Sequence, residues 1–356
     1  MYPVPCPGPV GGRIFCFCFG DFQEFSGPFV LRMLMMNFMD LTSCRLCPRN
    51  CGVNRKAGEL GFCGLPETIR AARAALLYCE EPCISGANGS GAIFFTGCNL
   101  GCRFCQNVDI SGGMRKAAAS SYAGETLTAD KLSDIMQKLQ EQGASNINLV
   151  TPSHILHVLI PALEKARQRG LHIPVVYNTA SYEKAEVLRA LEGLVDIYLP
   201  DLKYHDPQIS ASYSNAPDYW QSATAAIAEM VRQCPEPLFA DGSSSLNEED
   251  DRNDPLMTRG VIVRHMVMPG HTRDSMEILR YLYETYGNRI FISIMNQYTP
   301  MPRCADDPLL SRPVTKKEYD EVVDFAISLG IENGFLQEGG TISKSFIPAW
   351  DGTGIR

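Results

Sequence analysis

From residue 90 onward the chain alternates short apolar runs with amphipathic stretches, and this alternation restricts the fold more than any other feature. Such a pattern is typical of repeated β–α units, in which helices cover a largely parallel sheet. Six runs rich in Val, Ile, Phe or Tyr are predicted as strands buried on both faces. They are Ala92–Phe95, Ile147–Val150, Pro174–Asn178, Asp196–Leu199, Val261–Val267 and Ile290–Met295. Because a closed TIM barrel has eight units, we predict an α/β partial (β/α)6 TIM-like barrel whose functional residues gather at the C-terminal strand ends.

The stretches between the predicted strands carry helical signals. Leu and Met recur at helical spacing between residues 132 and 139, before Gly143. Thr315 and Glu318 have the spacing of a capping box at the start of a later helix. We expect the apolar faces of these helices to pack in the core.

The sequence predicts three parts. Residues 1–38 contain Cys6, Cys16 and Cys18 among Pro, Gly and Phe, and we interpret them as a disordered or spurious extension, with translation starting at or near Met39. Residues 39–89 are a Cys-rich N-terminal segment, and residues 90–356 form the partial barrel. Residues 243–254 are too polar and acidic to pack, so they are predicted to be an exposed loop before the fifth strand.

Composition limits the partners. The net charge is -8 and no basic stripe is present, so a nucleic-acid partner is not expected. No apolar run approaches the roughly 20 residues that a membrane-spanning helix needs, so no membrane span is expected. Most of the 14 cysteines precede residue 106, in closely spaced sets that indicate metal ligands rather than disulfides. We therefore expect a cytoplasmic protein.

Cys98, Cys102 and Cys105 form a C-x-x-x-C-x-x-C loop directly after the first predicted strand. Gly97 and Gly101 allow tight turns, so three thiolates can converge on one inorganic cluster and leave its fourth iron open. S-adenosylmethionine (AdoMet) can chelate an open iron through its amino and carboxylate groups. The alternatives are a zinc site and unrelated core cysteines, but structural zinc sites take four protein ligands and no histidine lies nearby in the sequence.

This loop, with Phe104 as its aromatic residue, resembles the signature of the radical AdoMet (radical SAM) superfamily. From about Cys44 to the C-terminus, the order of motifs is similar to the branch that contains pyruvate formate-lyase activating enzymes and their uncharacterised relatives. The resemblance implies a [4Fe–4S] cluster on the three cysteines, AdoMet as second cofactor, and a reduced flavodoxin or ferredoxin-type electron donor. It also implies a protein substrate.

The resemblance also assigns roles to residues at the strand ends. Asp201 and Lys203 correspond to a D-x-K element that contacts AdoMet and the target backbone. Arg264 corresponds to the arginine that pairs with the AdoMet carboxylate, whereas its neighbour His265 is expected to face the opposite side of the strand. The ribose position falls on Asn178 and Thr179, whose short polar side chains can bond hydroxyl groups.

A second set of cysteines lies earlier in the chain. Cys44, Cys47, Cys51 and Cys63 supply four ligands for tetrahedral zinc, an auxiliary iron–sulfur cluster or a rubredoxin-like iron, and their spacing does not choose among these. We expect this site to pin the N-terminal segment onto the barrel. Cys79 and Cys83 flank two glutamates, and we interpret them as isolated thiols that could join either site.

Two segments depart from the resemblance. Thr151 to His154 replace the usual Gly-Gly-Glu that meets the AdoMet amino group, and Thr151 and Ser153 hydroxyls could supply those contacts. Asn296 to Tyr298 occupy the position of a histidine in activating enzymes that act on peptides.

The sequence therefore predicts reductive cleavage of AdoMet to a 5′-deoxyadenosyl radical that abstracts hydrogen, with activation of a glycyl radical enzyme as one use. The alternatives are radical modification of a small molecule or RNA, and a non-catalytic iron–sulfur or zinc electron-transfer protein.

Overall fold

The computed structural model describes residues 39–112, 124–244, 246, 255–337 and 348–356. These residues belong to one compact unit, Phe38–Arg356, and the other unit, Met1–Asn37, lies outside the description. The expectations for residues 1–38, and for most of residues 243–254, concern residues outside the described ranges.

Seven neighbouring strands of the main sheet are parallel, in the order β10-β9-β8-β6-β5-β4-β2. Six of them correspond to the predicted strands, and the short β10 adds a seventh. Their bounds are β2 Ser90–Phe95, β4 Ile147–Val150, β5 Val175–Thr179, β6 Ile197–Pro200, β8 Met257–Met266, β9 Phe291–Met295 and β10 Gly334–Leu336. Every residue of β2, β5, β6 and β9 is buried, as expected for parallel strands covered on both faces.

The sheet continues beyond β2 with antiparallel strands. β1 (Ile69–Leu77) pairs with β2, and β3 (Glu125–Leu127) pairs with β1. The C-terminal residues lie along β1, where the Ala74 amide donates to the Thr353 carbonyl at 2.8 Å. A further short strand, β7 (Leu238–Phe239), pairs with β8. The predicted Cys-rich segment 39–89 therefore contributes a strand to the sheet.

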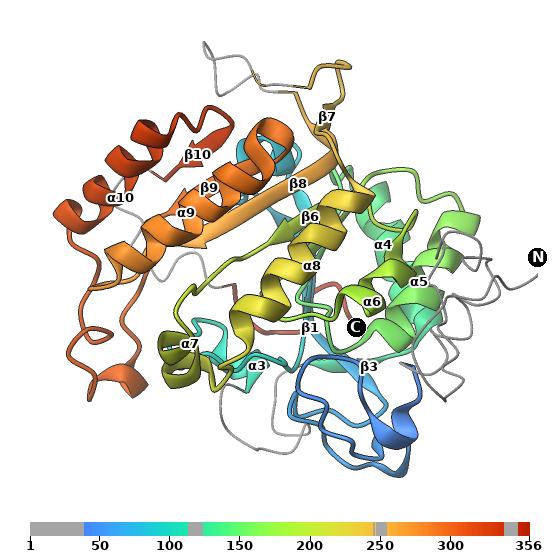
Figure 1. Cartoon of the computed structure of the whole chain (residues 1–356). Helices are drawn as coiled ribbons and strands as arrows, with labels where there is room; N and C mark the ends of the chain where they lie inside the picture. Colours follow the sequence, from blue (N-terminus) through green and yellow to red (C-terminus); the bar gives the residue numbers. More distant parts are fainter. Residues whose placement is uncertain (1–38, 113–123, 245, 247–254, 338–347) are drawn as a thin grey trace, which may run out of the picture. The chain divides into compact units, whose positions relative to one another are not determined.

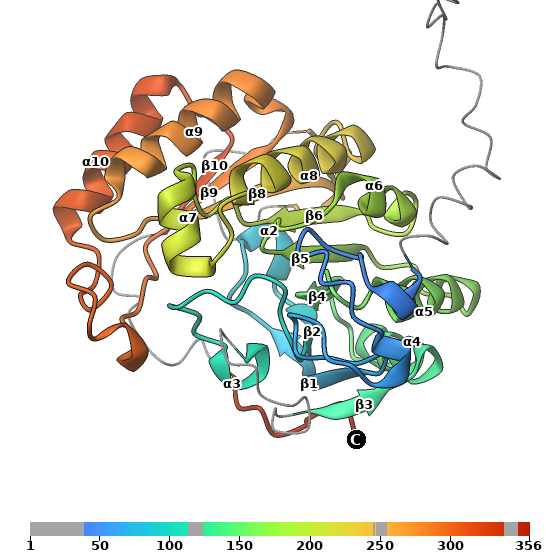
Figure 2. The same cartoon turned by 60° about the horizontal axis from the view of Figure 1, so that its bottom comes forward.

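Helices cover the outer face of the parallel strands (Figures 1 and 2). Their bounds are α2 Pro82–Ser85, α3 Val108–Ser111, α4 Ala129–Glu141, α5 Leu156–Gln168, α6 Ala185–Leu188, α7 Pro207–Ser214, α8 Tyr219–Gln233, α9 Thr272–Tyr286 and α10 Lys316–Leu329. Short 3-10 turns occupy Leu41–Ser43, Arg55–Ala57, Arg189–Leu191, Gly287–Arg289 and Pro302–Cys304.

Local sequence explains the helices that were predicted. The apolar positions of α4 are buried, which gives this helix one core-facing side. At the start of α10, Thr315 and Glu318 form the predicted capping box, with each side chain accepting a hydrogen bond from the other residue's backbone amide.

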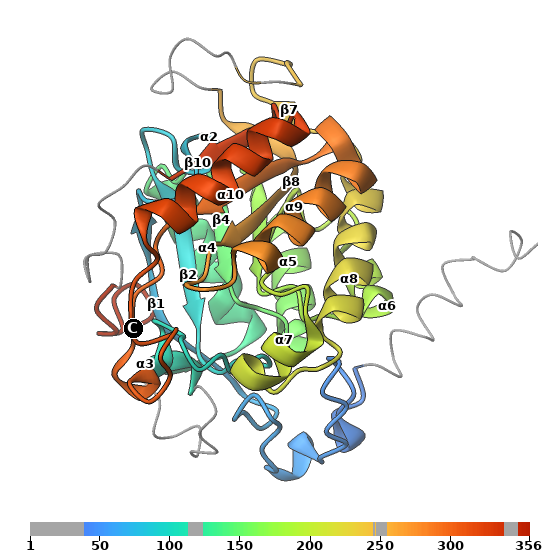
Figure 3. The same cartoon turned by 60° about the vertical axis from the view of Figure 1, so that its left-hand side comes forward.

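The main sheet is open, because β3 and β10 end the strand order without pairing to each other. This arrangement confirms the prediction of a partial TIM-like barrel with a Cys-rich N-terminal region. In Figure 3 the Cys-rich segment lies close to α7, at one end of the parallel strands. No helix within the described ranges is long and apolar enough to cross a membrane.

Candidate functional site

A cavity of about 450 Å³ is enclosed largely by the C-terminal ends of the parallel strands. Residues that end or follow β2, β4, β5, β6, β8 and β9 contribute to its wall, which is where a barrel fold places its chemistry. The structure brings seven of the residues selected from the sequence onto this wall. They are Cys98, Cys102, Cys105, Asn178, Asp201, Lys203 and Arg264.

The loop that carries the three cysteines leaves the buried strand β2 and turns at glycines. Gly97 and Gly101 have φ values of 90° and 71°, in the left-handed region that favours glycine. A Cβ on Gly97 would lie 2.7 Å from the carbonyl oxygen of Cys63. Glycine therefore lets the three-cysteine loop pass directly against the N-terminal segment.

The three thiols lie near one another and have polar neighbours. Ser214 Oγ donates to Cys102 Sγ at 3.2 Å, and Cys105 Sγ lies 3.3 Å from Ser111 Oγ. Burial, followed by the neighbouring Cys102 and Cys105, raises the pKa of the Cys98 thiol to about 12. The Cys98 thiol therefore keeps its proton until a metal displaces it.

The thiol arrangement fits an iron–sulfur cluster. Within the described ranges, no three His, Cys, Asp or Glu side chains are placed to hold a single metal ion. In a cluster each thiolate binds a different iron atom, so its cysteines surround a larger group than one ion. Three thiols on one short loop beside a cavity therefore suit a cluster that keeps one iron for another ligand.

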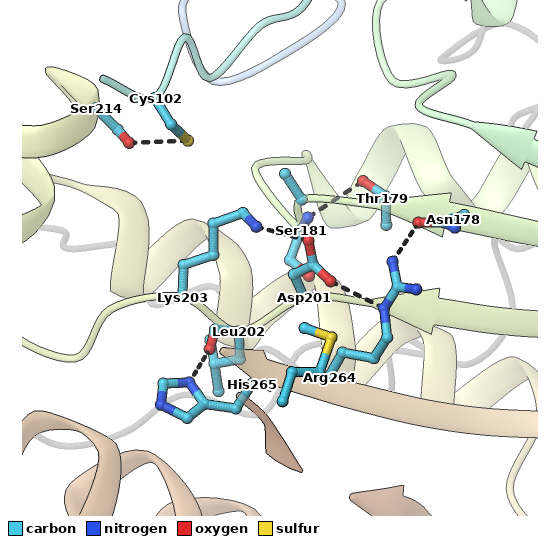
Figure 4. A network of polar contacts seen from close by, with 12 residues as sticks. Cys102, Asn178, Thr179, Ser181, Asp201, Leu202, Lys203, Ser214, Arg264 and His265 are labelled. Carbon is cyan, nitrogen blue, oxygen red and sulfur yellow. Dashed lines mark hydrogen bonds and ion pairs between the residues drawn. The ribbon is translucent and has the colours of Figure 1, made fainter. Parts of the chain in front are cut away.

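A charged network lies on the same cavity wall (Figure 4). The Arg264 guanidinium donates to Asp201 Oδ1 at 3.1 Å, to Glu80 Oε2 at 2.9 Å and to Asn178 Oδ1 at 2.7 Å. Lys203 Nζ donates to the other oxygen of Asp201 at 2.6 Å. The wall thus presents fixed charges of both signs, as recognition of a zwitterion requires.

The protonation states of this network follow from burial and pairing. Burial raises the pKa of Asp201, but Lys203 and Arg264 outweigh it, so the pKa falls below its ordinary value. Burial lowers the pKa of Lys203, and Asp201 more than reverses this effect. At Glu80 burial is stronger than the attraction of Arg264, and the pKa is raised. Ionisation is therefore least favourable at Glu80.

Alternation along the strands separates residues that are adjacent in sequence. Asn178 faces the cavity, whereas the Thr179 hydroxyl donates to Glu183 Oε1 at 2.6 Å and is not on the cavity wall. Arg264 faces the cavity, whereas His265 is buried behind it, with Nδ1 2.7 Å from the Leu202 carbonyl oxygen. The structure therefore places Thr179 off the cavity wall and His265 on the opposite side of β8 from Arg264.

Glu183 is a buried carboxyl group behind the cavity that the sequence did not indicate. Its Oε1 accepts hydrogen bonds from the hydroxyls of Ser153, Thr179 and Tyr177. Burial raises its pKa to about 7. The Ser153 hydroxyl is thereby committed to Glu183, while Thr151 does lie on the cavity wall.

The segment Asn296 to Tyr298, the second one that departs from the family resemblance, also reaches the cavity. Gln297 and Tyr298 lie on its wall, where the resemblance would place a histidine. The Gln297 carbonyl accepts from Gln106 Nε2 at 3.1 Å, which ties this segment to the residue after Cys105. The Tyr298 hydroxyl donates to the Leu310 carbonyl at 2.7 Å.

Glu80 is a site residue that sequence reasoning missed. It follows β1, and the last residue of β1, Leu77, pairs with Ser90, the first residue of β2. Glu80 therefore enters the barrel from the end opposite to the three-cysteine loop. The expectation that functional residues lie at the C-terminal ends of the strands does not cover that end. The signal in the sequence was the pair of carboxylates between Cys79 and Cys83.

The remaining predicted cysteines lie in three places. Cys44, Cys47, Cys51 and Cys63 gather in the N-terminal segment, where the Cys51 thiol donates to the Cys44 carbonyl oxygen at 3.9 Å. Cys79 is exposed and borders the cavity, and Cys83 is fully buried in the core.

The fold and the site define a class of protein: an α/β protein with an open, mainly parallel sheet and a three-cysteine loop facing a charged cavity. Residues 92–237 match the model of the radical SAM superfamily, so this part of the chain carries a radical SAM domain. A domain of this kind implies a [4Fe–4S] cluster and AdoMet as cofactors.

One relative is an uncharacterized protein of Methanocaldococcus jannaschii, 26% identical over 292 residues, which are 80% of this chain and 74% of the relative. Among solved structures, Streptococcus suis SuiB bound to the precursor peptide SuiA has a TM-score of 0.42 at 10% identity, over 68% of this chain and 46% of SuiB. The chain thus spans about half the length of SuiB. A domain of pyruvate-formate lyase-activating enzyme from Bacteroides vulgatus has a TM-score of 0.32 at 13% identity, over 51% of this chain and 89% of that domain.

Proposed function

We propose that this chain holds a [4Fe–4S] cluster through Cys98, Cys102 and Cys105 and uses AdoMet to abstract hydrogen from a separate substrate. The observation that carries the proposal is that the three thiols and the Arg264 network border the same cavity. A non-catalytic iron–sulfur protein has no need of a zwitterion-binding array beside its cluster.

When bound, the cluster and AdoMet supply an electron and the 5′-deoxyadenosyl radical that forms as the sulfonium is cleaved to methionine. The protein's part is to hold and orient them. Lys203 has three donors and bonds Asp201, so it can offer further donors to an anionic group in the cavity. Arg264 recognises a carboxylate with its planar fork, and Asp201 supplies the negative charge for an ammonium group.

Asn178 offers an amide to the ribose hydroxyls, because its side chain faces the cavity. Thr151 borders the cavity from the end of β4 and can contribute a hydroxyl to the amino end of AdoMet. The buried wall around these groups excludes water from the site of hydrogen abstraction.

For the substrate we propose a carbon-bound hydrogen of a protein, with a glycine in a glycyl radical enzyme as the first target to test. Support comes from the resemblance of Asp201 and Lys203 to the D-x-K element of activating enzymes, and from their position on the cavity wall. For the electron donor we propose a reduced flavodoxin or ferredoxin.

The test is product analysis. Protein reconstituted anaerobically with iron and sulfide, then reduced with dithionite in the presence of AdoMet, is expected to release 5′-deoxyadenosine, measured by liquid chromatography and mass spectrometry. Cys102→Ala is expected to abolish the release. The matched control is Cys234→Ala, which removes a buried thiol that is not on the cavity wall and should leave the release unchanged. Release that persists in Cys102→Ala would overturn the proposal.

A further inference from the structure

The four cysteines of the N-terminal segment are brought together by a chain that turns through glycines. Gly52, Gly58 and Gly64 adopt positive φ values of 67°, 88° and 80°. A Cβ placed on Gly61 would lie 3.3 Å from Cys63 Sγ and 3.6 Å from Cys51 Sγ, so these two thiols converge around one glycine. The Cys51 thiol also donates to the Cys44 carbonyl oxygen at 3.9 Å, and Cys47 lies near Cys51 and Cys63, so the four residues form one group away from the cavity.

A buried arginine lies against this group. Arg55 is 1% exposed and directs Nη1 to Cys44 Sγ at 3.9 Å. Its Nε and Nη1 also donate to the carbonyl oxygens of Pro66 and His154, at 2.9 and 3.0 Å. Its Nη2 is buried and, within the described ranges, has no hydrogen-bond partner.

The charge of Arg55 requires a counter-charge close by. Arginine stays protonated in proteins, and an unpaired buried charge is strongly unfavourable. The described part of the chain gives Arg55 carbonyl oxygens and a sulfur atom as partners, and carbonyl oxygens carry no net charge. Thiols are neutral as well, whereas metal-bound cysteines are thiolates. Four thiolates outweigh the positive charge of the metal that they bind, so the ligated group as a whole would carry the missing negative charge.

We propose that Cys44, Cys47, Cys51 and Cys63 bind a second metal centre as thiolates, next to Arg55. The ligand class is an iron–sulfur cluster, because within the described ranges no three His, Cys, Asp or Glu side chains are placed to hold a single metal ion. Binding transfers the four thiol protons to solvent and involves no change in oxidation state at sulfur. This proposal is independent of AdoMet cleavage.

The proposed centre is joined to the three-cysteine loop by Arg49, which lies between Cys47 and Cys51 in the sequence. The Arg49 guanidinium donates to the carbonyl oxygens of Asn99 and Leu100, both at 2.8 Å, which belong to the loop between Cys98 and Cys102. A further bond of 2.8 Å reaches the Ser214 carbonyl at the end of α7.

Aromatic rings hold the Arg49 guanidinium in place. It lies 3.8 Å from the ring centre of Phe62, the neighbour of Cys63, and 4.9 Å from that of Tyr182. A metal centre that fixes Cys47, Cys51 and Cys63 therefore also fixes Arg49 and the ring beneath it. We infer that Arg49 is a positioning residue for the three-cysteine loop, an inference that rests on the proposed function.

The metal centre is tested by removing the first site. The full chain with Cys98→Ala, Cys102→Ala and Cys105→Ala is purified anaerobically and analysed for zinc, iron and acid-labile sulfide. Iron together with acid-labile sulfide supports the proposal, whereas zinc, or iron without sulfide, contradicts the cluster. The further changes Cys51→Ser and Cys63→Ser should remove that metal, whereas Cys79→Ser, at an exposed cysteine outside the set, should retain it.

Two results would overturn the metal centre: a folded triple variant without metal, or metal that remains after Cys51→Ser and Cys63→Ser. If the triple variant does not fold, the Cys51→Ser and Cys63→Ser pair in the otherwise unchanged chain decides the question. It should lose the iron and sulfide of the second centre while keeping the iron and sulfide of the three-cysteine site. An unchanged metal content in that pair contradicts the proposal.

The coupling through Arg49 is tested with Arg49→Ala. The second metal should stay bound, while the electron paramagnetic resonance signal of the reduced three-cysteine cluster, and its shift on addition of AdoMet, should change. Arg45→Ala is the matched control, because Arg45 is an exposed arginine of the same segment. A signal identical to that of the unchanged protein would refute the coupling and leave the metal centre and AdoMet cleavage to their own tests.

Discussion

The Arg264 guanidinium and the Asp201 carboxylate meet at 3.1 Å although 63 positions separate them in the chain. Their backbones form a parallel bridge between the residue that follows β6 and the C-terminal part of β8. The crossover between these two strands therefore places a negatively charged carboxylate and a positively charged guanidinium side by side on the cavity wall.

Arg264→Lys should weaken AdoMet binding by about tenfold or more, because an ammonium cannot reproduce the three-way contact with Asp201, Glu80 and an incoming carboxylate. Binding is measured by calorimetry or by the AdoMet-induced change in the cluster's resonance signal. Arg280→Lys, which alters an exposed ion pair with Glu277, serves as the control. Equal affinity in Arg264→Lys would rule out a role for the guanidinium fork.

Neighbouring residues of β5 should respond differently to mutation. Asn178→Ala should weaken AdoMet binding, since its amide faces the cavity. Thr179→Val should instead lower the free energy of unfolding by about 1–3 kcal/mol, because it removes a hydroxyl that bonds the buried Glu183. Binding and urea-unfolding measurements on both variants test this. A larger loss of affinity in Thr179→Val than in Asn178→Ala would contradict the assignment of faces.

Much of the fold could be predicted because the parallel strands are buried on both faces and read as apolar runs. The strand Ile147–Val150 has the predicted bounds, and the others differ mainly at their ends. β1 was missed because its core is rich in alanine, which gives little strand signal, and β10 because it has three residues.

Within the site, the family resemblance selected Asp201, Lys203 and Arg264, and the strand-end rule agrees with that choice, because these residues lie near or just after the ends of parallel strands. The rule could not find Glu80, which enters from the other end after an antiparallel strand. The strand-end rule also could not predict that the Thr179 side chain points away from the cavity. Which side chains of a strand point inward depends on the register of the strand, and sequence alone does not fix that register. Arg49 and Arg55 were missed for a similar reason: their partners lie in loops distant in sequence.

Glu80→Ala should lower the free energy of unfolding by about 3 kcal/mol, because it leaves the buried Arg264 with one fewer counter-charge and an unfilled acceptor position. Glu80→Gln should cost less, since the amide oxygen still accepts a hydrogen bond and burial already disfavours the charged carboxylate. Urea unfolding measures both. Glu277→Ala, in an exposed pair, should change stability by less than about 0.5 kcal/mol. If Glu80→Ala lowers the free energy of unfolding no more than Glu277→Ala does, Glu80 and Arg264 do not form a stabilising buried ion pair.

Glu183 should make stability depend on pH. Burial raises its pKa from 4.5 to about 7 in the folded protein, so the folded state keeps a proton that the unfolded chain has already released. The contribution to stability is full below pH 4.5 and is lost as the pH rises through about 7, a change of about 3 kcal/mol. Glu183→Gln cannot ionise and still offers an acceptor to the three hydroxyls, so its unfolding free energy should not show this fall.

The measurement is urea unfolding of the unchanged protein and Glu183→Gln between pH 5 and pH 8. The two curves should lie closest at the acid end and separate as the pH rises, with the variant the more stable at pH 8. Glu141→Gln, at an exposed position on α4, should follow the unchanged protein throughout. Parallel curves for Glu183→Gln and the unchanged protein would mean that Glu183 does not titrate in this range, because only a difference in proton binding between the folded and unfolded states can make the curves diverge.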